Sequence, residues 1–416
     1  MRWQSSMKIL VVCQHYYPEN FQITDICEEL VRHGNQVTVL TGIPNYPQGE
    51  YFDGYDVHHR RHEKRNGVEI IRAREIPRHK GLFHLMINYI SFCFFASLKA
   101  LSIKRDFDVI YAYQLSPILM VIPAIILKHL TGKRMFLYCC DLWPESCEAF
   151  ISNKSIFYKV IKFFSTRIYR QSDVIAVESE DFLDYFMLRH QIEEKRLLYI
   201  PQFADSSYLE QNFAKPHEGI NFVFLGNVGK PQNLDCFIKA FSKVHSQTDF
   251  LVHIVGTGSY VNELKTMVKE YGLQSRFIFH GRHPVEEMGR FYSIADACIM
   301  GLIGESIIGH TIPNKLQGYM AAGKTVIAAI DGAAADVIQT AECGIAVSAG
   351  DAEALAKGIQ DFLDYPDKYS KCGENGRQYF KEHFHKDQHI KSVETVIEVL
   401  NREEAEQWIP YLKIEH

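Results

Sequence analysis

Short apolar segments alternate with amphipathic segments along the whole chain. The apolar segments are rich in Val and Ile, and unbroken apolar strands between helices are typical of parallel sheets covered on both faces. Helical periodicity, as in Glu19–Val31 and Ser155–Arg170, separates most of them. The predicted strands are Lys8–Cys13, Gln36–Thr41, Val68–Arg72, Asp108–Ala112, Arg134–Cys139 and Asp173–Val177 in a first set, and Asn221–Leu225, Phe250–Val255, Phe277–Phe279, Ala297–Met300, Thr325–Ala329 and Ile345–Val347 in a second.

Two sets of strands predict an α/β fold with two Rossmann-like, doubly wound domains in series. The polar segment Ile200–Ser207, which contains Pro201 at its start, suits a linker between them. We place the first domain at residues 1–200, the linker at 201–215 and the second domain at 216–386. Ligands are expected at the carboxyl ends of the strands, in a cleft between the two facing domains.

Composition excludes several classes of protein. The 416 residues are 47% hydrophobic and 23% charged, which excludes disordered and fibrous chains. A net charge of −5 argues against a nucleic-acid partner. The 10 cysteines form no C-x-x-C pair and no metal-ligand spacing with histidines, so we expect no metal and a cytoplasmic location. The opening Ile9–Val12 run is too short for a signal peptide and fits a first strand.

One segment, Gly81–Leu98, has no formal charge and approaches the length of a membrane span. His84, Asn88 and Ser91 form a narrow polar stripe along it, and basic residues flank it on both sides. A covering helix of the first domain is one interpretation, and a face that dips into an anionic membrane surface is the other.

Glycines follow two predicted strands of the second domain and allow a phosphate to approach backbone N–H groups. They lie in the segments 226–230, with Gly226, Asn227 and Lys230, and 255–259, with Gly256. A third segment, 310–316, opens a predicted helix that runs to Ala322. There Thr311 is expected to cap the helix and Pro313 to lie in its first turn, with Asn314 and Lys315 beside a diphosphate. Each segment also has an alternative interpretation as an ordinary turn or capped helix.

Polar and aromatic residues follow strands of the first domain as well. Asp141 and Glu145 come directly after a buried strand, where they are expected to handle protons or to orient a sugar hydroxyl. The alternative is that Asp141 only caps the next turn. Two earlier loops supply His15, a catalytic candidate or a plain loop residue, and four candidates for acceptor binding, which are Tyr17, Asn20, Asn45 and Tyr46.

Two further segments resemble functional motifs. Asp106-Phe107-Asp108 has a metal-binding spacing but falls at the amino end of a strand, away from the ligand edge. The basic run His58–Arg65 is interpreted as a solvated loop, with contact to lipid headgroups as the alternative.

Together these motifs resemble the retaining GT-B glycosyltransferases of family 4, in particular bacterial enzymes of O-antigen or capsule assembly, among them proteins assigned as N-acetyl-fucosamine transferases. The resemblance covers nearly the whole chain. It rests on the segments 9–20, 45–49, 141–145, 226–229, 313–315 and 319–324.

The resemblance implies a nucleotide-sugar donor in the second domain, an acceptor in the first, and no cofactor or metal. Donor and acceptor are expected to be a UDP-linked N-acetyl or amino-deoxy hexose and an undecaprenyl-diphosphate-linked saccharide at the inner face of the plasma membrane. Retention without an enzymic nucleophile implies front-face attack. In such folds the last helices, here residues 387–416, cross back to the first domain.

The chain departs from the family pattern at two places. Two family glutamates, eight residues apart, fall on His310 and Gly318, and the usual Gly-Arg of the phosphate loop reads Gly226-Asn227. We interpret this as a variant donor site in which Lys230 or Lys315 neutralises the diphosphate. Two alternatives stay open, a nucleotide-sugar 2-epimerase and a non-catalytic nucleotide-sugar-binding partner.

Overall fold

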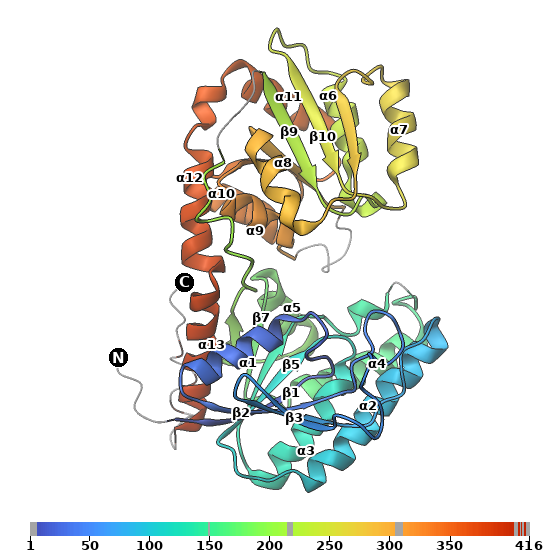
Figure 1. Cartoon of the computed structure of the whole chain (residues 1–416), viewed down its shortest axis with the longest axis vertical. Coiled ribbons are helices and arrows are strands. Elements are labelled where there is room, and N and C mark those ends of the chain that lie inside the picture. The colour runs from blue at the N-terminus through green and yellow to red at the C-terminus, as the bar shows by residue number, and fades with distance from the viewer. Residues whose placement is uncertain are drawn as a thin grey trace. The chain divides into compact units, whose positions relative to one another are not determined.

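A computed structural model describes residues 6–148, 150–213, 219–303, 311–402, 407, 409 and 412. The chain divides into unit 1, residues 1–200 with 390–415, and unit 2, residues 201–389, with the last residue also assigned to unit 2. Each unit contains one sheet with helices around it (Figure 1). The predicted fold class, two Rossmann-like parallel α/β sheets, is confirmed.

The sheet of unit 1 has the strand order β3-β4-β2-β1-β5-β6-β7-β8, and all neighbours except β3 and β4 run parallel. Its main elements are β1 (Lys8–Val12), α1 (Gln22–Arg32), β2 (Gln36–Thr41), β3 (His62–Arg65), β4 (Val68–Arg72), α2 (Leu82–Ser102), β5 (Val109–Gln114), the 3-10 helix η1 (Ile118–Val121), α3 (Ile122–Thr131), β6 (Met135–Cys139), η2 (Glu145–Cys147), α4 (Ile156–Tyr169), β7 (Val174–Val177), α5 (Asp181–His190) and β8 (Leu197–Tyr199).

The sheet of unit 2 has the order β11-β10-β9-β12-β13-β14 and is parallel throughout. Its main elements are β9 (Ile220–Leu225), η4 (Lys230–Gln232), α6 (Leu234–Phe241), β10 (Phe250–Val255), α7 (Val261–Glu270), β11 (Phe277–Gly281), η5 (Val285–Glu287), α8 (Met288–Ile294), β12 (Ala297–Gly301), α9 (Asn314–Ala321), β13 (Thr325–Ala329), α10 (Ala333–Thr340), β14 (Gly344–Val347), α11 (Ala352–Asp364), α12 (Cys372–Tyr379) and η8 (Phe380–Phe384). The last helix, α13 (Lys386–Asn401), belongs to unit 1 from Ile390 onward.

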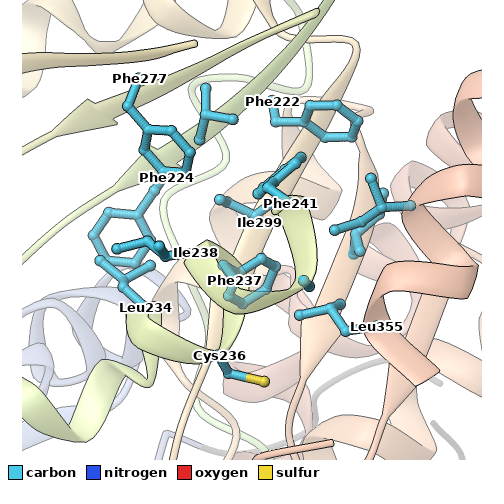
Figure 2. Packing of buried hydrophobic residues seen from close by; sticks show 14 of the residues in the cluster. Phe222, Phe224, Leu234, Cys236, Phe237, Ile238, Phe241, Phe277, Ile299 and Leu355 are labelled. Atoms are coloured by element: carbon cyan, nitrogen blue, oxygen red, sulfur yellow. The ribbon is translucent and has the colours of Figure 1, made fainter. Parts of the chain in front are cut away.

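Apolar side chains of alternate strand positions and helix faces fill the core of unit 2. Phe222 and Phe224 of β9 pack with Phe237 and Phe241 of α6 and with Leu355 of α11 (Figure 2). The rings of Phe222 and Phe241 meet edge to face with centroids 5.1 Å apart. This core fixes β9, so the loop that follows β9 starts from a rigid strand end.

The basic run contains a strand, so its prediction as a solvated loop is wrong in part. His62–Arg65 pairs antiparallel with β4 and forms the edge of the sheet. Charged side chains are ordinary on an edge strand because they discourage pairing with another chain. Two of its charges are also paired, Glu63 with Arg72 at 2.5 Å and Arg65 with Glu28 at 3.1 Å.

The predicted cap of α9 is wrong as well. The helix begins at Asn314 with Pro313 as its N-cap residue, and no side chain caps it. Proline fits there because it has no N–H that would need a partner. Thr311 lies before the helix and is half-buried.

Substitution of Gly256 tests how closely the loops of unit 2 pack. A Cβ at this position would lie 1.8 Å from the carbonyl oxygen of Gly226, and its φ is +142°. We expect Gly256→Ala to lower the free energy of unfolding by about 3 kcal/mol or more. The matched control is Gly272→Ala, which has φ +70° but open space around the new Cβ, and should cost only about 1 kcal/mol. Urea unfolding followed by circular dichroism measures both, and equal costs would contradict the close packing.

Candidate active site

The carboxyl ends of four neighbouring strands meet at one edge of the unit 1 sheet. Strands β2, β1, β5 and β6 are adjacent in that order. The loops after them supply Tyr46, His15, Ser116 and Asp141 in turn, and all four residues line a cavity of about 620 Å³. Two predicted catalytic candidates and one acceptor candidate therefore come together.

Asp141 is held at the cavity wall by the neighbouring loop. Its Oδ2 accepts a hydrogen bond of 2.7 Å from the backbone N–H of Ser116. The hydroxyl of the same serine accepts a bond of 3.1 Å from the indole Nε1 of Trp143, which also lines the cavity. The carboxylate is therefore oriented by a fixed loop. Asp141 caps the backbone N–H of Ser116 and also lines the cavity, so the two predicted roles do not exclude each other.

His15 is held by Glu19, a residue that sequence reasoning did not select. The carboxylate of Glu19 lies 3.1 Å from His15 Nδ1 and accepts the backbone N–H groups of Asn45 at 2.8 Å and Tyr46 at 2.7 Å. It therefore joins the loops after β1 and β2. The ring of His15 stacks on Phe21, and its Nε2 has no hydrogen-bond partner among the described residues. The sequence offered one signal for Glu19, namely its spacing of four residues from His15.

Arg78 supplies a positive charge at the same cavity. Its guanidinium lies 5.2 Å from the centre of the Tyr46 ring. No carboxylate among the described residues forms an ion pair with it. Arg78 belongs to the basic residues that precede the apolar helix, and nothing in that pattern assigned it to a site.

The other candidates of unit 1 lie away from the cavity. Glu145 is buried, and its carboxylate accepts hydrogen bonds from the hydroxyls of Tyr158 and Tyr185. Asn45 is also buried, and its Oδ1 accepts the backbone N–H of Arg78 at 3.0 Å. The Arg65 guanidinium lies 3.6 Å from the centre of the Tyr17 ring, and Asn20 is exposed. Of the two carboxylates proposed for catalysis, the structure brings only Asp141 to the cavity.

Helix α2 buries polar residues beside small apolar ones and exposes most of its large apolar residues. Asn88 and Ser91, from the predicted polar stripe, are buried, whereas His84 is exposed. Asn88 Nδ2 donates a hydrogen bond of 2.6 Å to Glu75 Oε1, which also accepts one of 2.8 Å from Gln14 Nε2. Within the described residues, α2 is the one helix long and apolar enough to cross a membrane, by length and composition alone.

Glu75 gives this buried network a pH dependence. Burial raises its pKa to about 7, while the electrostatic influence of the neighbouring His15 ring and the bond from Gln14 act in the opposite direction. Because the folded protein holds the proton more tightly than the unfolded chain does, this group loses stabilising free energy as the pH rises from about 4.5 to 7. We expect Glu75→Gln to gain about 3 kcal/mol of unfolding free energy relative to wild type between pH 4.5 and pH 8. Urea unfolding at both pH values measures the difference, and a constant difference would show that Glu75 does not titrate this way.

In unit 2, two glycine loops lie against each other at the carboxyl ends of β9 and β10. The backbone N–H of Gly226 donates to the Val255 carbonyl at 3.0 Å, and that of Val228 donates to the Thr257 carbonyl at 3.0 Å. Gly226 and Asn227 are exposed, and Gly256 is half-buried. The absence of a side chain at Gly256 permits this contact, because a Cβ there would lie 1.8 Å from the carbonyl oxygen of Gly226.

Lys315, in the first turn of α9, lies beside the first of these loops. Its Nζ would lie 3.6 Å from a Cβ built on Gly226, lies 4.3 Å from the centre of the Phe224 ring, and donates to Gln232 Oε1. Burial lowers the pKa of Lys315 to about 8. An ammonium group that is partly stripped of water gains more from a nearby anion than a solvated one does. The structure thus brings Gly226 and Lys315 together, with Asn314 exposed next to Lys315 and Lys230 exposed at the start of η4.

The position of the second family glutamate is tightly packed, so a side chain there would require Tyr292 to shift. A Cβ on Gly318 would lie 3.1 Å from the hydroxyl oxygen of Tyr292. The position of the first, His310, lies outside the described residues. Within the described residues, no group of three or more His, Cys, Asp or Glu side chains is arranged to hold a metal ion.

Two family models match consecutive parts of the chain. The Glycosyltransferase Family 4 model matches residues 21–208, and the model of Glycosyl transferases group 1 matches residues 207–379. Among curated proteins, the chain is 22% identical over 385 residues to the Escherichia coli (strain K12) protein WcaI, provisionally assigned as a colanic acid biosynthesis glycosyl transferase, covering 86% of this chain and 93% of WcaI.

Solved structures resemble the chain over nearly its whole length. Sucrose-phosphate synthase from Thermosynechococcus elongatus matches with a TM-score of 0.68 and 18% identity over 95% of this chain and 99% of that one. Anabaena HepE, solved in complex with UDP, matches with a TM-score of 0.69 and 13% identity over 94% and 100%. These structures show the GT-B fold, and the two family models, which together match residues 21–379, show that the chain belongs to the retaining group 1 and family 4 glycosyltransferases, which are nucleotide-sugar-dependent enzymes.

Proposed function

We propose that the protein transfers an N-acetyl or amino-deoxy hexose from a UDP-sugar to a lipid-linked saccharide during assembly of a surface polysaccharide. The observation that carries this proposal is the cavity of unit 1, which combines His15, Asp141 and Arg78 with apolar residues of α2 such as Leu82 and Met86. A polar end suits a sugar hydroxyl, and an apolar wall suits a lipid carrier. The similarity to WcaI supports polysaccharide assembly.

The donor is proposed to bind in unit 2 through its diphosphate. Lys315, beside the exposed Gly226, is proposed to contact the diphosphate where negative charge grows as the nucleotide leaves. Such an interaction lowers the barrier because it strengthens in the transition state. Asn227, Lys230, Gly256, Thr311 and Asn314 are the further proposed donor-binding residues. UDP is favoured as the nucleotide because HepE was solved with UDP.

The acceptor hydroxyl is proposed to bind at Asp141. A carboxylate held by the N–H of Ser116 can accept a hydrogen bond from the hydroxyl and orient it toward the donor sugar. His15 lies on the same cavity and can hold a second group of the acceptor. The acceptor is proposed to be carried on undecaprenyl diphosphate, with the protein at the cytoplasmic face of the plasma membrane.

Transfer of labelled sugar tests the proposal. The protein is incubated with UDP-sugars labelled in the hexose and with a bacterial lipid extract, and the label in the organic phase is measured. We expect label in a lipid product with the anomeric configuration of the donor retained, and about 10²-fold less label or lower with Asp141→Asn. Label that appears only as free sugar, or only as an epimerised nucleotide sugar, would contradict lipid-linked transfer and would favour hydrolysis or the 2-epimerase alternative.

A further inference from the structure

Helix α4 resembles α2 in burying polar residues while large apolar residues stay exposed. Its buried residues are Tyr158, Ser165, Ile168 and Tyr169, whereas several of its large apolar residues are exposed. Phe157 is 71% exposed and Ile156 is 67% exposed. Large apolar side chains that cluster in water indicate a surface that binds a partner. The further exposed apolar residues on α4 are Val160, Phe163 and Phe164.

Hydrogen bonds explain why polar residues of α4 turn inward. Tyr158 turns inward because its hydroxyl donates to the carboxylates of Glu145 and Glu148, each at 3.1 Å. Thr166 lies 2.8 Å from the buried His190 through its hydroxyl oxygen. These polar anchors fix the rotation of α4 about its axis, so the large apolar side chains on its other face point away from the core.

The two helices flank one cavity. The cavity that reaches His15 and Asp141 is also lined by Met86 and Ile90 of α2 and by Phe164 of α4. In Figure 1 both helices lie on the same side of unit 1. The exposed apolar residues of α2 are Leu82, Phe83, Met86, Ile90, Phe94, Leu98 and Leu101, so the apolar face defined by α2 and α4 surrounds the cavity rather than lying apart from it.

The two sequence segments that contain α2 and α4 carry formal charges of one sign. The sequence has no Asp or Glu from residue 76 to 105, which includes α2, or from 149 to 172, which includes α4. A surface hollow of about 480 Å³ along α4 is lined by Lys159, Lys162, Arg167 and Arg170. The first three of these form no ion pair with a described residue. Unpaired cations beside exposed aromatic side chains complement anionic headgroups above an apolar layer.

We propose that α2 and α4 together form the bilayer-docking face of this protein, that the basic hollow of α4 binds anionic phospholipid headgroups, and that the acceptor's lipid chain enters the cavity between the two helices. This inference rests on the proposed function and adds the second helix, the headgroup site and the entry path. The polar anchors of Asn88 and Tyr158 hold both helices against the protein, so they lie along the membrane surface and do not cross it.

Flotation with lipid vesicles tests the docking face directly. The full chain is mixed with vesicles of phosphatidylethanolamine and phosphatidylglycerol, or of phosphatidylcholine alone, and the bound fraction is measured at low and high salt. We expect binding to the anionic vesicles that weakens with salt. Phe157→Ser with Phe163→Ser should weaken binding by about tenfold or more, since each removes an inserted aromatic ring. Lys159→Gln with Lys162→Gln should weaken binding to anionic vesicles and reduce its salt dependence.

Matched controls distinguish an effect of this face from the effect of removing any exposed apolar or charged side chain. Leu188→Ser with Val285→Ser removes two apolar side chains that are 81% and 68% exposed on other elements, and should bind as wild type does. Lys265→Gln with Lys269→Gln removes two exposed lysines four residues apart on α7, and should do the same. Equal melting temperatures confirm that each variant is folded.

The outcomes distinguish this inference from the proposed function. Wild type that floats with neither vesicle, or a Phe157/Phe163 variant that binds as tightly as wild type, would overturn the docking face even if sugar transfer to a lipid acceptor in detergent proceeds. A wild-type dimer that the same variant converts to a monomer, without vesicle binding, would assign the face to a second copy of the chain and also overturn it. Vesicle binding lost only in the α2 and α4 variants, without transfer to any lipid, would support the docking face and reject the proposed function.

Discussion

Replacement of Lys315 by methionine is expected to lower kcat/KM for the nucleotide-sugar donor by about 10²- to 10³-fold. The ammonium group lies beside Gly226, where the leaving diphosphate is proposed to bind, and methionine keeps the length of the side chain while removing its charge. The interaction grows as charge develops on the leaving nucleotide, so we expect kcat to fall together with donor affinity. Initial rates of UDP release at varied donor concentrations measure both.

The pH dependence of the same lysine gives a second signature. Because burial lowers the pKa of Lys315 to about 8, the fraction of charged ammonium falls as the pH rises through this value. Donor affinity of the free enzyme should therefore decrease above about pH 8. Lys315→Arg keeps its charge over this range and should not show the decrease.

A control on the same unit is Lys239→Met, which removes an exposed lysine of α6 and should change neither kcat nor KM. Full activity of Lys315→Met would show that the diphosphate is neutralised elsewhere.

Replacement of Asp141 by asparagine is expected to lower kcat by about 10²- to 10³-fold while leaving the affinity for UDP unchanged. Asparagine has the same size, and its carbonyl oxygen can still accept the N–H of Ser116, so the loop should keep its conformation. What is lost is a charged acceptor for the hydrogen bond of the sugar hydroxyl. Rates with a saturating donor and calorimetric titration with UDP separate the two effects.

Asp108→Asn is the matched control for that experiment. Asp108 Oδ2 accepts the backbone N–H of Lys8 at 2.8 Å, the same kind of bond that Asp141 makes, but at the amino ends of β1 and β5. This variant should keep its activity. An Asp141→Asn enzyme with unchanged kcat would show that Asp141 only caps the loop, and a loss of UDP affinity would show that it acts on the donor.

The sequence predicts the strands well because each buried parallel strand is a short run of Val, Ile and other apolar residues between amphipathic helices. The edge strand β3 was missed because an antiparallel edge strand with alternating exposure carries charged residues and has no apolar run. The predicted start of α9 was too early because Thr311 matches a capping pattern, whereas the helix begins at Asn314, directly after Pro313.

The site could be predicted only where a functional residue directly follows a strand. Asp141 and His15 could be found in this way, and the parallel sheet brings them to one cavity. Glu145 follows Asp141 closely in sequence, but the 3-10 turn between β6 and α4 directs its side chain into the interior. Glu75 and Glu19 bind residues far along the chain, and these partners leave no local signal. The spacing of four residues between His15 and Glu19 is the one local sign of either carboxylate.

The orientation of the apolar helices was not accessible from periodicity. The spacing of Asn88 and Ser91 shows that they share one side of α2, but does not say which side faces the core. Here the side that carries Asn88 and Ser91 faces the core, where Phe92 packs and where Glu75 accepts a hydrogen bond from Asn88. In α4 the inward position of Tyr158 depends on Glu145 and Glu148, which accept hydrogen bonds from its hydroxyl.

Calorimetric titration of the purified protein with UDP, GDP, ADP and TDP, with and without EDTA, tests the central claim most directly, namely that unit 2 holds the nucleotide diphosphate of a sugar donor through Lys315 without a metal ion. The account predicts selective binding of UDP that EDTA does not change and that Lys315→Met weakens strongly. Binding of no nucleotide, or binding that EDTA abolishes, would contradict it.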